Sequence, residues 1–326
     1  MEKGTTLKNG QYEIISDTVN AGGFGRIYRA YGSRREKNGD RHIVAIKEFC
    51  VNELQDLLNR SVSLGTYSMA EVKDHVKLLR DKFYEEADLL AKLNDQRDRH
   101  VPRVHGKVFK DGGRLFYAMT FIDGPTLTQV VKDRGALSEE IAVDLIVQIG
   151  KVLYKAHNWG VMHCDVSPNN IMLENGFAIL VDFGNAKSNP SLIHNIERPS
   201  DILYCLDLHS LNIPDFDLLI GTPGFSPAST LIGTPQGDVY SLAATLFFLL
   251  TGKKCATLVS QQSLNNSIEL LEGNNVSKKT VTAIMNVLNV MSDNCTTDMK
   301  KFLSELPYKI VFNSLLNYND YDYDKR

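Results

Sequence analysis

Short runs of apolar residues, separated by polar or glycine-bearing breaks, cover the first 50 positions of the chain. Three of these runs, at 12–19, 25–31 and 43–49, are rich in β-branched and aromatic residues, which is typical of β-strands. The charged break between the last two contains Asn38-Gly39, a dipeptide that favours a tight hairpin turn. The pattern therefore predicts strands joined by turns in this part of the chain.

A helical period follows between residues 51 and 94, with a break at 61–68. Apolar residues recur at steps of three and four within 77–93, and they are Leu79, Phe83, Ala87, Leu90 and Leu93. Such spacing places their side chains on one face of a helix. Two more strands are predicted at 104–110 and 115–121, on either side of a glycine-rich turn.

The pattern changes from strands to helices after Asp123-Gly124-Pro125. Apolar helical stretches are predicted at 138–157 and 238–251, and shorter helices at 262–273, 277–292 and 296–305. The segment 185–220 has little periodicity and predicts a long loop, of a length that is usually functional inside a compact domain. The chain is thus expected to combine a strand-rich part that contains one main helix with a helix-rich part.

Composition and charge narrow the class of protein. Hydrophobic residues make up 43% of the 326 positions and charged residues 23%, so the chain is not globally disordered. The formal net charge of -3 argues against nucleic-acid binding through bulk charge, and the five scattered cysteines suggest reduced thiols. The most apolar run, at 242–250, is far shorter than the ~20 residues of a membrane-spanning helix, and no apolar signal segment is visible. We therefore expect a cytoplasmic protein without a nucleic-acid or membrane partner.

The first candidate motif is the glycine-rich segment Asn20-Ala21-Gly22-Gly23-Phe24-Gly25-Arg26-Ile27, between two predicted strands. Glycines allow backbone N–H groups to approach phosphate oxygens, because no Cβ stands in the way. Asn20 stands where the usual G-x-G-x-x-G pattern has its first glycine, a mild change because asparagine tolerates left-handed conformations. Taken alone, the segment is explained equally well by a hairpin turn.

The second motif is Val44-Ala45-Ile46-Lys47, on the strand after the glycine-rich segment. A lone lysine after an apolar run is most often a surface residue at a strand end, but this strand would pair back beneath the glycines. The Lys47 amine would then point at the same phosphates and would need a carboxylate to position it. Glu86, which precedes Ala87 on the apolar helix face, is a better candidate than Glu85. Two exposed helix acids are the alternative interpretation.

The third motif is His163-Cys164-Asp165-Val166-Ser167-Pro168-Asn169-Asn170, followed by Asp182-Phe183-Gly184. Asp165 precedes Asn170 by five positions, and Asp182 follows Asn170 by twelve. The set would place two carboxylates and an amide oxygen around one cleft. Hard oxygen ligands with few protein contacts suit Mg²⁺ that is held mainly by nucleotide phosphates.

In this order, the three motifs resemble the signature set of protein kinases, and the chain is similar to eukaryotic-like serine/threonine protein kinases of bacterial type. Further matches are the hinge-like 116–127, Gly221-Thr222-Pro223-Gly224-Phe225 and Asp238-Val239-Tyr240-Ser241-Leu242. The resemblance implies an α+β, bilobal protein-kinase-like fold. Its small N-lobe, at 1–122, would be an antiparallel sheet with one main helix, and its larger helical C-lobe would cover 123–310. A polar tail would follow at 311–326.

The resemblance also implies roles for single residues. Lys47, held by Glu86, would bind the α- and β-phosphates of ATP, and Asp165 would orient the substrate hydroxyl and take its proton. Asn170 and Asp182 would hold Mg²⁺. The remaining nucleotide-binding residues would be the phosphate-covering Asn20, Gly22, Gly23 and Gly25, the adenine-contacting Ile27, Ala45 and Met172, the gatekeeper Met119, and the hinge residues Thr120, Phe121 and Ile122.

Several positions depart from the kinase pattern. Cys164 replaces the arginine that binds an activation-loop phosphate in many kinases, so activity is not expected to need that phosphate. Ser167 replaces a lysine that would neutralise the transferring phosphate, and Lys187 is a candidate substitute. Pro227-Ala228-Ser229 stands where A-P-E is usual, and no arginine lies between Arg198 and Arg326 to pair with the missing glutamate. We interpret the joint loss of both partners as a structural replacement.

The sequence therefore favours a kinase that transfers the γ-phosphoryl group of ATP, with Mg²⁺, to serine or threonine hydroxyls of protein substrates. Autophosphorylation and a role in signalling are part of this expectation. One alternative is a small-molecule phosphotransferase with a related catalytic loop, which often lacks a lysine at the Ser167 position. Another is a pseudokinase that binds nucleotide and acts by interaction.

Overall fold

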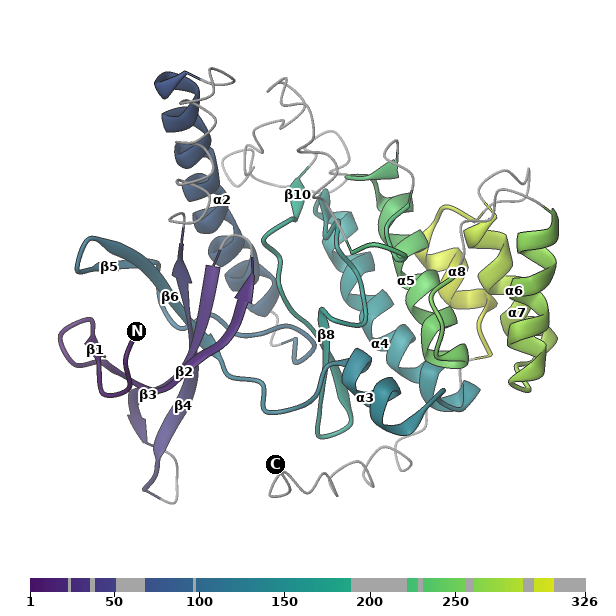
Figure 1. Cartoon of the computed structure of the whole chain (residues 1–326), viewed down its shortest axis with the longest axis horizontal. Coiled ribbons are helices and arrows are strands. Elements are labelled where there is room, and N and C mark those ends of the chain that lie inside the picture. The colour runs from purple at the N-terminus through teal and green to yellow at the C-terminus, as the bar shows by residue number, and fades with distance from the viewer. Residues whose placement is uncertain are drawn as a thin grey trace. The chain divides into compact units, whose positions relative to one another are not determined.

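The computed structural model describes residues 1–22, 25–35, 39–50, 68–95, 98–188, 222–227, 231–255, 261–289 and 296–307. These residues form two compact units, with the division between Ile122 and Asp123 (Figure 1). The turn predicted around Asn38, the helical stretch at 51–67, most of the long loop and the polar tail lie outside the described residues. Each unit is described by itself below.

The sheet of the first unit has antiparallel strands in the order β1-β2-β3-β4-β6-β5. They are β1 Thr6–Leu7, β2 Tyr12–Gly22, β3 Gly25–Arg35, β4 Arg41–Phe49, β5 Phe109–Asp111 and β6 Arg114–Thr120. The strands predicted at 12–19, 25–31 and 43–49 are confirmed as β2, β3 and β4. The prediction at 104–110 is wrong for most of its length, because Gly106 adopts a φ of +87° and Val104 makes a single bridge to Met119.

Alternate residues of these strands form an apolar cluster on one face of the sheet. The cluster consists of Leu7, Tyr12, Ile14, Tyr28, Ala30, Val44, Ile46, Phe116 and Ala118. The sheet curls around it, since the Lys8 backbone N–H after β1 donates a hydrogen bond of 2.6 Å to Asp111 Oδ2 in β5, at the other edge. The intervening residues, which include Ala45 and Lys47, face the opposite side of the sheet.

Helix α2, Met69–Asp95, packs on that opposite side. The Phe83 ring lies 5.1 Å from the ring of Tyr117 in β6 and 5.4 Å from that of Phe49 in β4. The predicted apolar face is confirmed, because each of its members is at most 6% exposed: Leu79, Phe83, Ala87, Leu90 and Leu93.

The second unit consists mainly of helices. They are α3 Leu127–Arg134, α4 Glu139–Asn158, α5 Pro235–Thr251, α6 Gln261–Gly273, α7 Lys278–Leu288 and α8 Met299–Glu305. Two small strand pairs accompany them, β7 Val161–Met162 with β10 Lys187–Ser188, and β8 Ile171–Glu174 with β9 Phe177–Leu180. Helix α5 is buried along most of its length and packs against α4 and α7, so it forms the centre of this unit.

The predicted helices of the second unit are confirmed, with shifts at their ends. Helix α5 begins three residues before the predicted start, because the Thr234 side chain caps it and Pro235 fits the first turn. Helix α3 was not predicted, although Thr126 and Gln129 form a capping box at its start. Its eight residues are too few for a clear helical period after the Gly124-Pro125 break.

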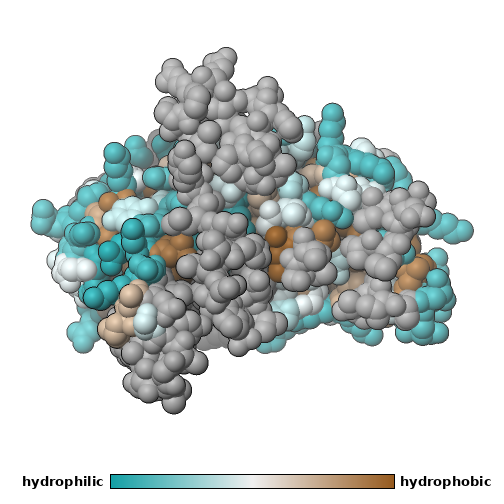
Figure 2. All heavy atoms as spheres, turned by 90° about the horizontal axis from the view of Figure 1, so that it is seen from above, coloured by the Kyte–Doolittle hydropathy of each residue, from teal (hydrophilic) through white to brown (hydrophobic). Residues whose placement is uncertain are grey.

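The described surface offers little apolar area. The face in Figure 2 is mainly hydrophilic where residues are described, with small hydrophobic areas between. Large hydrophobic side chains that are exposed in the described part are Met69, Tyr84 and Tyr154. Among the described helices, none has the length and apolar character that crossing a bilayer would require.

Candidate active site

A buried ion pair marks the face of the first unit's sheet that packs against α2. Lys47 lies on β4 between β3 and β6, and its Nζ donates hydrogen bonds of 2.6 and 2.8 Å to the two carboxylate oxygens of Glu86. Lys47 is 7% exposed and Glu86 is 5% exposed. Glu86 adjoins Ala87 on the buried helix face, whereas Glu85 is half-buried. The structure thus brings together Lys47 and Glu86, the pair that the helix periodicity favoured.

Gly25, in the glycine-rich segment, lies directly against this lysine. Gly22 pairs with Gly25 where β2 and β3 meet, and Asn20 pairs with Ile27. A Cβ on Gly25 would lie 3.2 Å from Lys47 Cε and 3.0 Å from the Glu48 carbonyl oxygen. Glycine at this position therefore leaves room for the lysine stem to lie along β3. Gly23, the remaining predicted glycine, lies outside the described residues.

The residues predicted to contact adenine in this unit share the Lys47 face. Ile27 pairs with Lys47 across β3 and β4, and Ala45 pairs with Met119 across β4 and β6. Strand alternation places the side chains of Ile27, Ala45 and Met119 on the side away from the apolar cluster. The chain then continues through Thr120, Phe121 and Ile122. The Arg29 guanidinium lies 4.8 Å from the centre of the Phe121 ring, and Ile122 is 8% exposed.

A second buried carboxylate, next to Lys47 in sequence, points to the other face. Glu48 is 2% exposed and accepts hydrogen bonds of 2.8 Å from the Tyr28 hydroxyl and the Arg114 guanidinium. Burial and the neighbouring Glu48 raise the pKa of Cys50 to about 11, so this thiol stays protonated at neutral pH. Because Glu48 is satisfied on its own face, it does not compete with Glu86 for Lys47.

In the second unit, Asp165 stands at the centre of a hydrogen-bonded cluster. Asn170 Nδ2 donates bonds of 2.9 Å to the Asp165 backbone oxygen and to Oδ2. The Thr222 hydroxyl donates a bond of 2.8 Å to Asp165 Oδ1 and lies 3.2 Å from Ser167 Oγ. Both carboxylate oxygens of Asp165 are therefore held in place. A general base needs such a fixed orientation, because it must lie within hydrogen-bond reach of the proton that it accepts. Thr222 was not among the predicted site residues, because its contact spans 57 positions.

Asp238 supports the backbone just before Asp165. This carboxylate is 1% exposed at the start of α5, and it accepts hydrogen bonds from the backbone N–H groups of His163 at 2.8 Å and Cys164 at 2.9 Å. His157 Nε2 lies 2.9 Å from its Oδ2. Cys164 adopts a φ of +65°, a left-handed conformation that costs energy outside glycine and persists only where the surroundings fix it. The sequence signal for Asp238 is an acid ahead of a long apolar helix, and its contacts with the backbone at 163 and 164 cannot be identified from that signal.

The predicted metal ligands follow on adjoining segments. The Val181 N–H donates a bond of 2.9 Å to the Asn170 backbone oxygen, so Asp182 comes one residue beyond this contact. Asp182 is exposed, has a φ of +62° and precedes the buried Phe183. Because Asn170 uses its amide nitrogen on Asp165, its amide oxygen is the atom that remains to face a cation. One amide oxygen and one carboxylate fit Mg²⁺, whose other ligands are usually phosphates and water.

Met172, the predicted adenine contact from the second unit, lies on β8 opposite Ile179. It also makes a bridge to Thr126, just before α3. The half-buried Met172 is therefore tied to the segment that follows Asp123.

The structure shows what surrounds Ser167, which stands where the kinase pattern has a lysine. Ser167 is 0% exposed, and its hydroxyl lies beside that of Thr222. Lys187, the candidate substitute cation, instead lays its side chain over Gly233, where a Cβ would be 3.0 Å from Lys187 Cδ. In the described part of the chain, the neighbour of the Ser167 hydroxyl is thus the Thr222 hydroxyl, a neutral group.

Ser167→Lys is expected to destabilise the second unit. A long charged side chain would enter a site in which serine is already fully buried, and such overpacking typically costs about 1–3 kcal/mol. Urea denaturation measures the effect, with Ser167→Ala as a control that removes the hydroxyl without adding volume. If Ser167→Lys unfolded at the wild-type urea concentration, the site would have to be open enough to take a cation.

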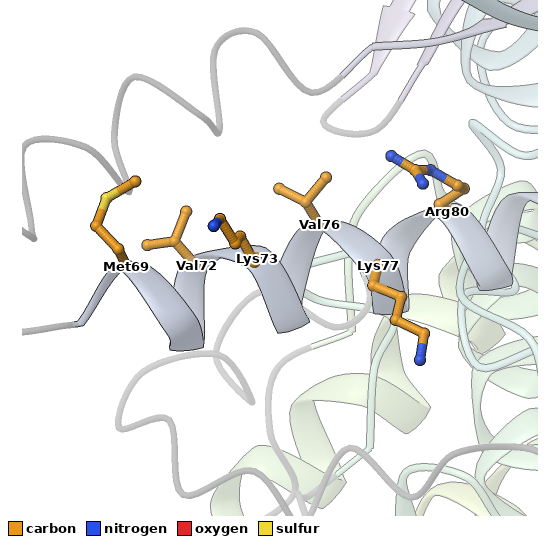
Figure 3. A pocket seen from close by; sticks show the side chains of 6 residues that line it. All are labelled: Met69, Val72, Lys73, Val76, Lys77 and Arg80. Atoms are coloured by element: carbon orange, nitrogen blue, oxygen red, sulfur yellow. The ribbon is translucent and has the colours of Figure 1, made fainter.

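A pocket lies elsewhere on the first unit, along the first half of α2 (Figure 3). Six residues of one helix face line it: Met69, Val72, Lys73, Val76, Lys77 and Arg80. None of the predicted site residues is among them. The pocket is therefore separate from the Lys47–Glu86 pair.

Comparison with known proteins gives the class to which this fold and these motifs belong. The family model of the protein kinase domain matches residues 15–310, so the chain belongs to the protein kinase family. The predicted α+β protein-kinase-like fold is thereby confirmed.

Two bacterial relatives illustrate the similarity. Serine/threonine-protein kinase PknA of Nostoc sp. is 27% identical over 252 residues, which are 76% of this chain and 38% of that protein. Serine/threonine-protein kinase C of Synechocystis sp. is 28% identical over 258 residues, which are 78% of this chain and 41% of that protein. This chain thus spans about two-fifths of the length of these relatives.

Among solved structures, the crystal structure of Rad53 1-466 in complex with AMP-PNP has the same fold. It matches with a TM-score of 0.58 at 19% identity, over 91% of this chain and 65% of that chain.

Proposed function

We propose that the chain is a protein kinase that transfers the γ-phosphoryl group of ATP to serine or threonine hydroxyls of proteins, itself included. The observation that carries this proposal is the set of charged side chains that each unit holds in position. The first holds Lys47 in a buried ion pair with Glu86, and the second holds the Asp165 carboxylate between Asn170 and Thr222. Bacterial relatives that are named serine/threonine-protein kinases support it.

Within this proposal, the glycine-rich segment of Asn20, Gly22, Gly23 and Gly25 covers the phosphates of ATP. Lys47 binds the α- and β-phosphates, and the adenine ring lies among Ile27, Ala45, Met119, Met172 and the hinge residues 120–122. Asn170 and Asp182 hold Mg²⁺, which supplies charge neutralisation of the phosphates when it is bound. Asp165 takes the proton of the substrate hydroxyl. We also propose a cytoplasmic, signalling role with protein substrates.

The single test is phosphate transfer from γ-labelled ATP to a general protein acceptor, measured beside aminoglycoside and choline acceptors. We expect label in the protein acceptor and in the chain itself, in serine and threonine, and loss of transfer when EDTA removes Mg²⁺. Label in a small molecule alone would instead support a small-molecule phosphotransferase, the alternative that the absence of lysine at Ser167 favours. Nucleotide binding without any transfer would identify a pseudokinase.

A further inference from the structure

A tight turn follows the long loop and leads away from the Asp165 cluster. The Phe225 N–H donates a bond of 3.0 Å to the Thr222 carbonyl, and Gly224 has a φ of +89°. Proline at the second position and a positive φ at the third are the pattern of a type II turn. In such a turn the carbonyl of the second residue, here Pro223, takes no part in the turn's own hydrogen bond. Because Pro223 is exposed, its carbonyl is open to a partner, which can be water or a side-chain donor.

Lys254 supplies that partner. Its Nζ donates a hydrogen bond of 2.9 Å to the Pro223 carbonyl and lies 5.6 Å from the centre of the Phe225 ring. A Cβ on Gly224 would lie 2.8 Å from Lys254 Cδ, so the lysine stem covers the glycine. Phe225 is 3% exposed and meets the ring of Phe248 edge-on at 5.7 Å. One side chain therefore holds three successive residues of the turn.

The backbone that leads to Lys254 is fixed to α5, the central helix of the unit. Gly252 ends α5 in the left-handed conformation, and its N–H donates a bond of 2.8 Å to the Phe248 carbonyl. The Thr251 hydroxyl donates a bond of 2.8 Å to the Phe247 carbonyl and accepts one of 3.2 Å from the Lys253 N–H. Lys254 thus projects from a rigid helix end.

The other end of the turn is Thr222, whose hydroxyl binds Asp165. We propose that Lys254 is a positioning residue, which holds the turn 222–225 so that the Thr222 hydroxyl stays on the Asp165 carboxylate. The proposal rests on the proposed kinase function for its effect on turnover, but the contact itself does not depend on that function.

The test compares Lys254→Met, Lys254→Arg and the matched control Lys253→Met in the full chain. Methionine keeps much of the stem over Gly224 but loses the donor and the charge, whereas arginine keeps both. Lys253 is the neighbouring lysine and is exposed like Lys254, so its replacement changes the net charge equally. Hydrogen exchange at the Phe225 and Ser226 amides, which both donate to the Thr222 carbonyl, reports on the turn without any need for catalysis.

We expect Lys254→Met to speed exchange at these two amides about fivefold, the effect of losing one typical hydrogen bond. Its kcat for protein phosphorylation should fall by a similar factor while KM for ATP stays at the wild-type value. Lys254→Arg should restore both readouts, and Lys253→Met should leave both unchanged.

The proposal would be overturned if the two amides of Lys254→Met exchanged at the wild-type rate. It would also be overturned if Lys254→Arg changed the exchange rate and kcat as much as Lys254→Met does. Wild-type kcat in Lys254→Met would overturn the link to Asp165. A wild-type chain that transfers no phosphate would instead contradict the proposed function, and the exchange data would still decide whether Lys254 holds the turn.

Discussion

Replacing Lys47 by methionine should strongly slow phosphate transfer and also destabilise the first unit. The loss of a lysine that clamps transferring phosphates is expected to lower kcat by about 10²–10³, the range found when one preorganised donor is removed. The stability effect comes from Glu86, which is 5% exposed and would keep its carboxylate without its partner. Breaking a buried ion pair on one side typically costs about 3–5 kcal/mol.

A double variant separates the two effects. Lys47→Met with Glu86→Gln removes the buried charge together with its partner, so the free energy of unfolding should return most of the way to the wild-type value. Phosphate transfer should stay as slow as in Lys47→Met, because the phosphate-binding amine is still absent. The measurements are urea denaturation and transfer from γ-labelled ATP. Restored transfer in the double variant would contradict the assigned role of Lys47, and a single variant as stable as wild type would contradict the burial of the pair.

The sequence predicted this pair because two local signals agreed on it. A strand that pairs back beneath the glycines placed Lys47, and the apolar helix face of α2 favoured Glu86, next to Ala87, over Glu85. Both signals are local, because each comes from the backbone geometry of a single element. The division into a strand-rich and a helix-rich part was predictable for the same reason, whereas the bilobal kinase-like fold followed from the family resemblance.

Polar contacts between distant segments have no such local signature. Thr222 reaches Asp165 across 57 positions, and Asp238 reaches His163 across 75, so neither partner could be identified from spacing. The failed strand at 104–110 shows the converse, since its apolar residues fit a strand but the left-handed Gly106 interrupts it. The contact of Lys254 with Pro223 has no local signature either, because it depends on the turn at Gly224.

Asp165→Asn tests the proposed proton acceptor with almost no change in shape. The asparagine can turn its amide oxygen to Asn170 Nδ2, which keeps donating as it now does to Asp165 Oδ2. Its amide nitrogen then faces the Thr222 hydroxyl, which can rotate to accept instead of donate. The fold should therefore persist, with a melting temperature near that of wild type.

Transfer should nevertheless fall, because an amide cannot take the proton of the substrate hydroxyl. General base catalysis typically contributes about 10²–10⁴-fold, and we expect kcat to drop by that range while nucleotide binding is retained. Thr222→Val provides the comparison, since it removes the hydroxyl at 2.8 Å from Asp165 Oδ1 but leaves the base in place. Its loss should be about fivefold, the scale of one hydrogen bond. If Asp165→Asn lost no more activity than Thr222→Val, Asp165 would act by holding Thr222 and Asn170 in position, and another group would have to take the proton.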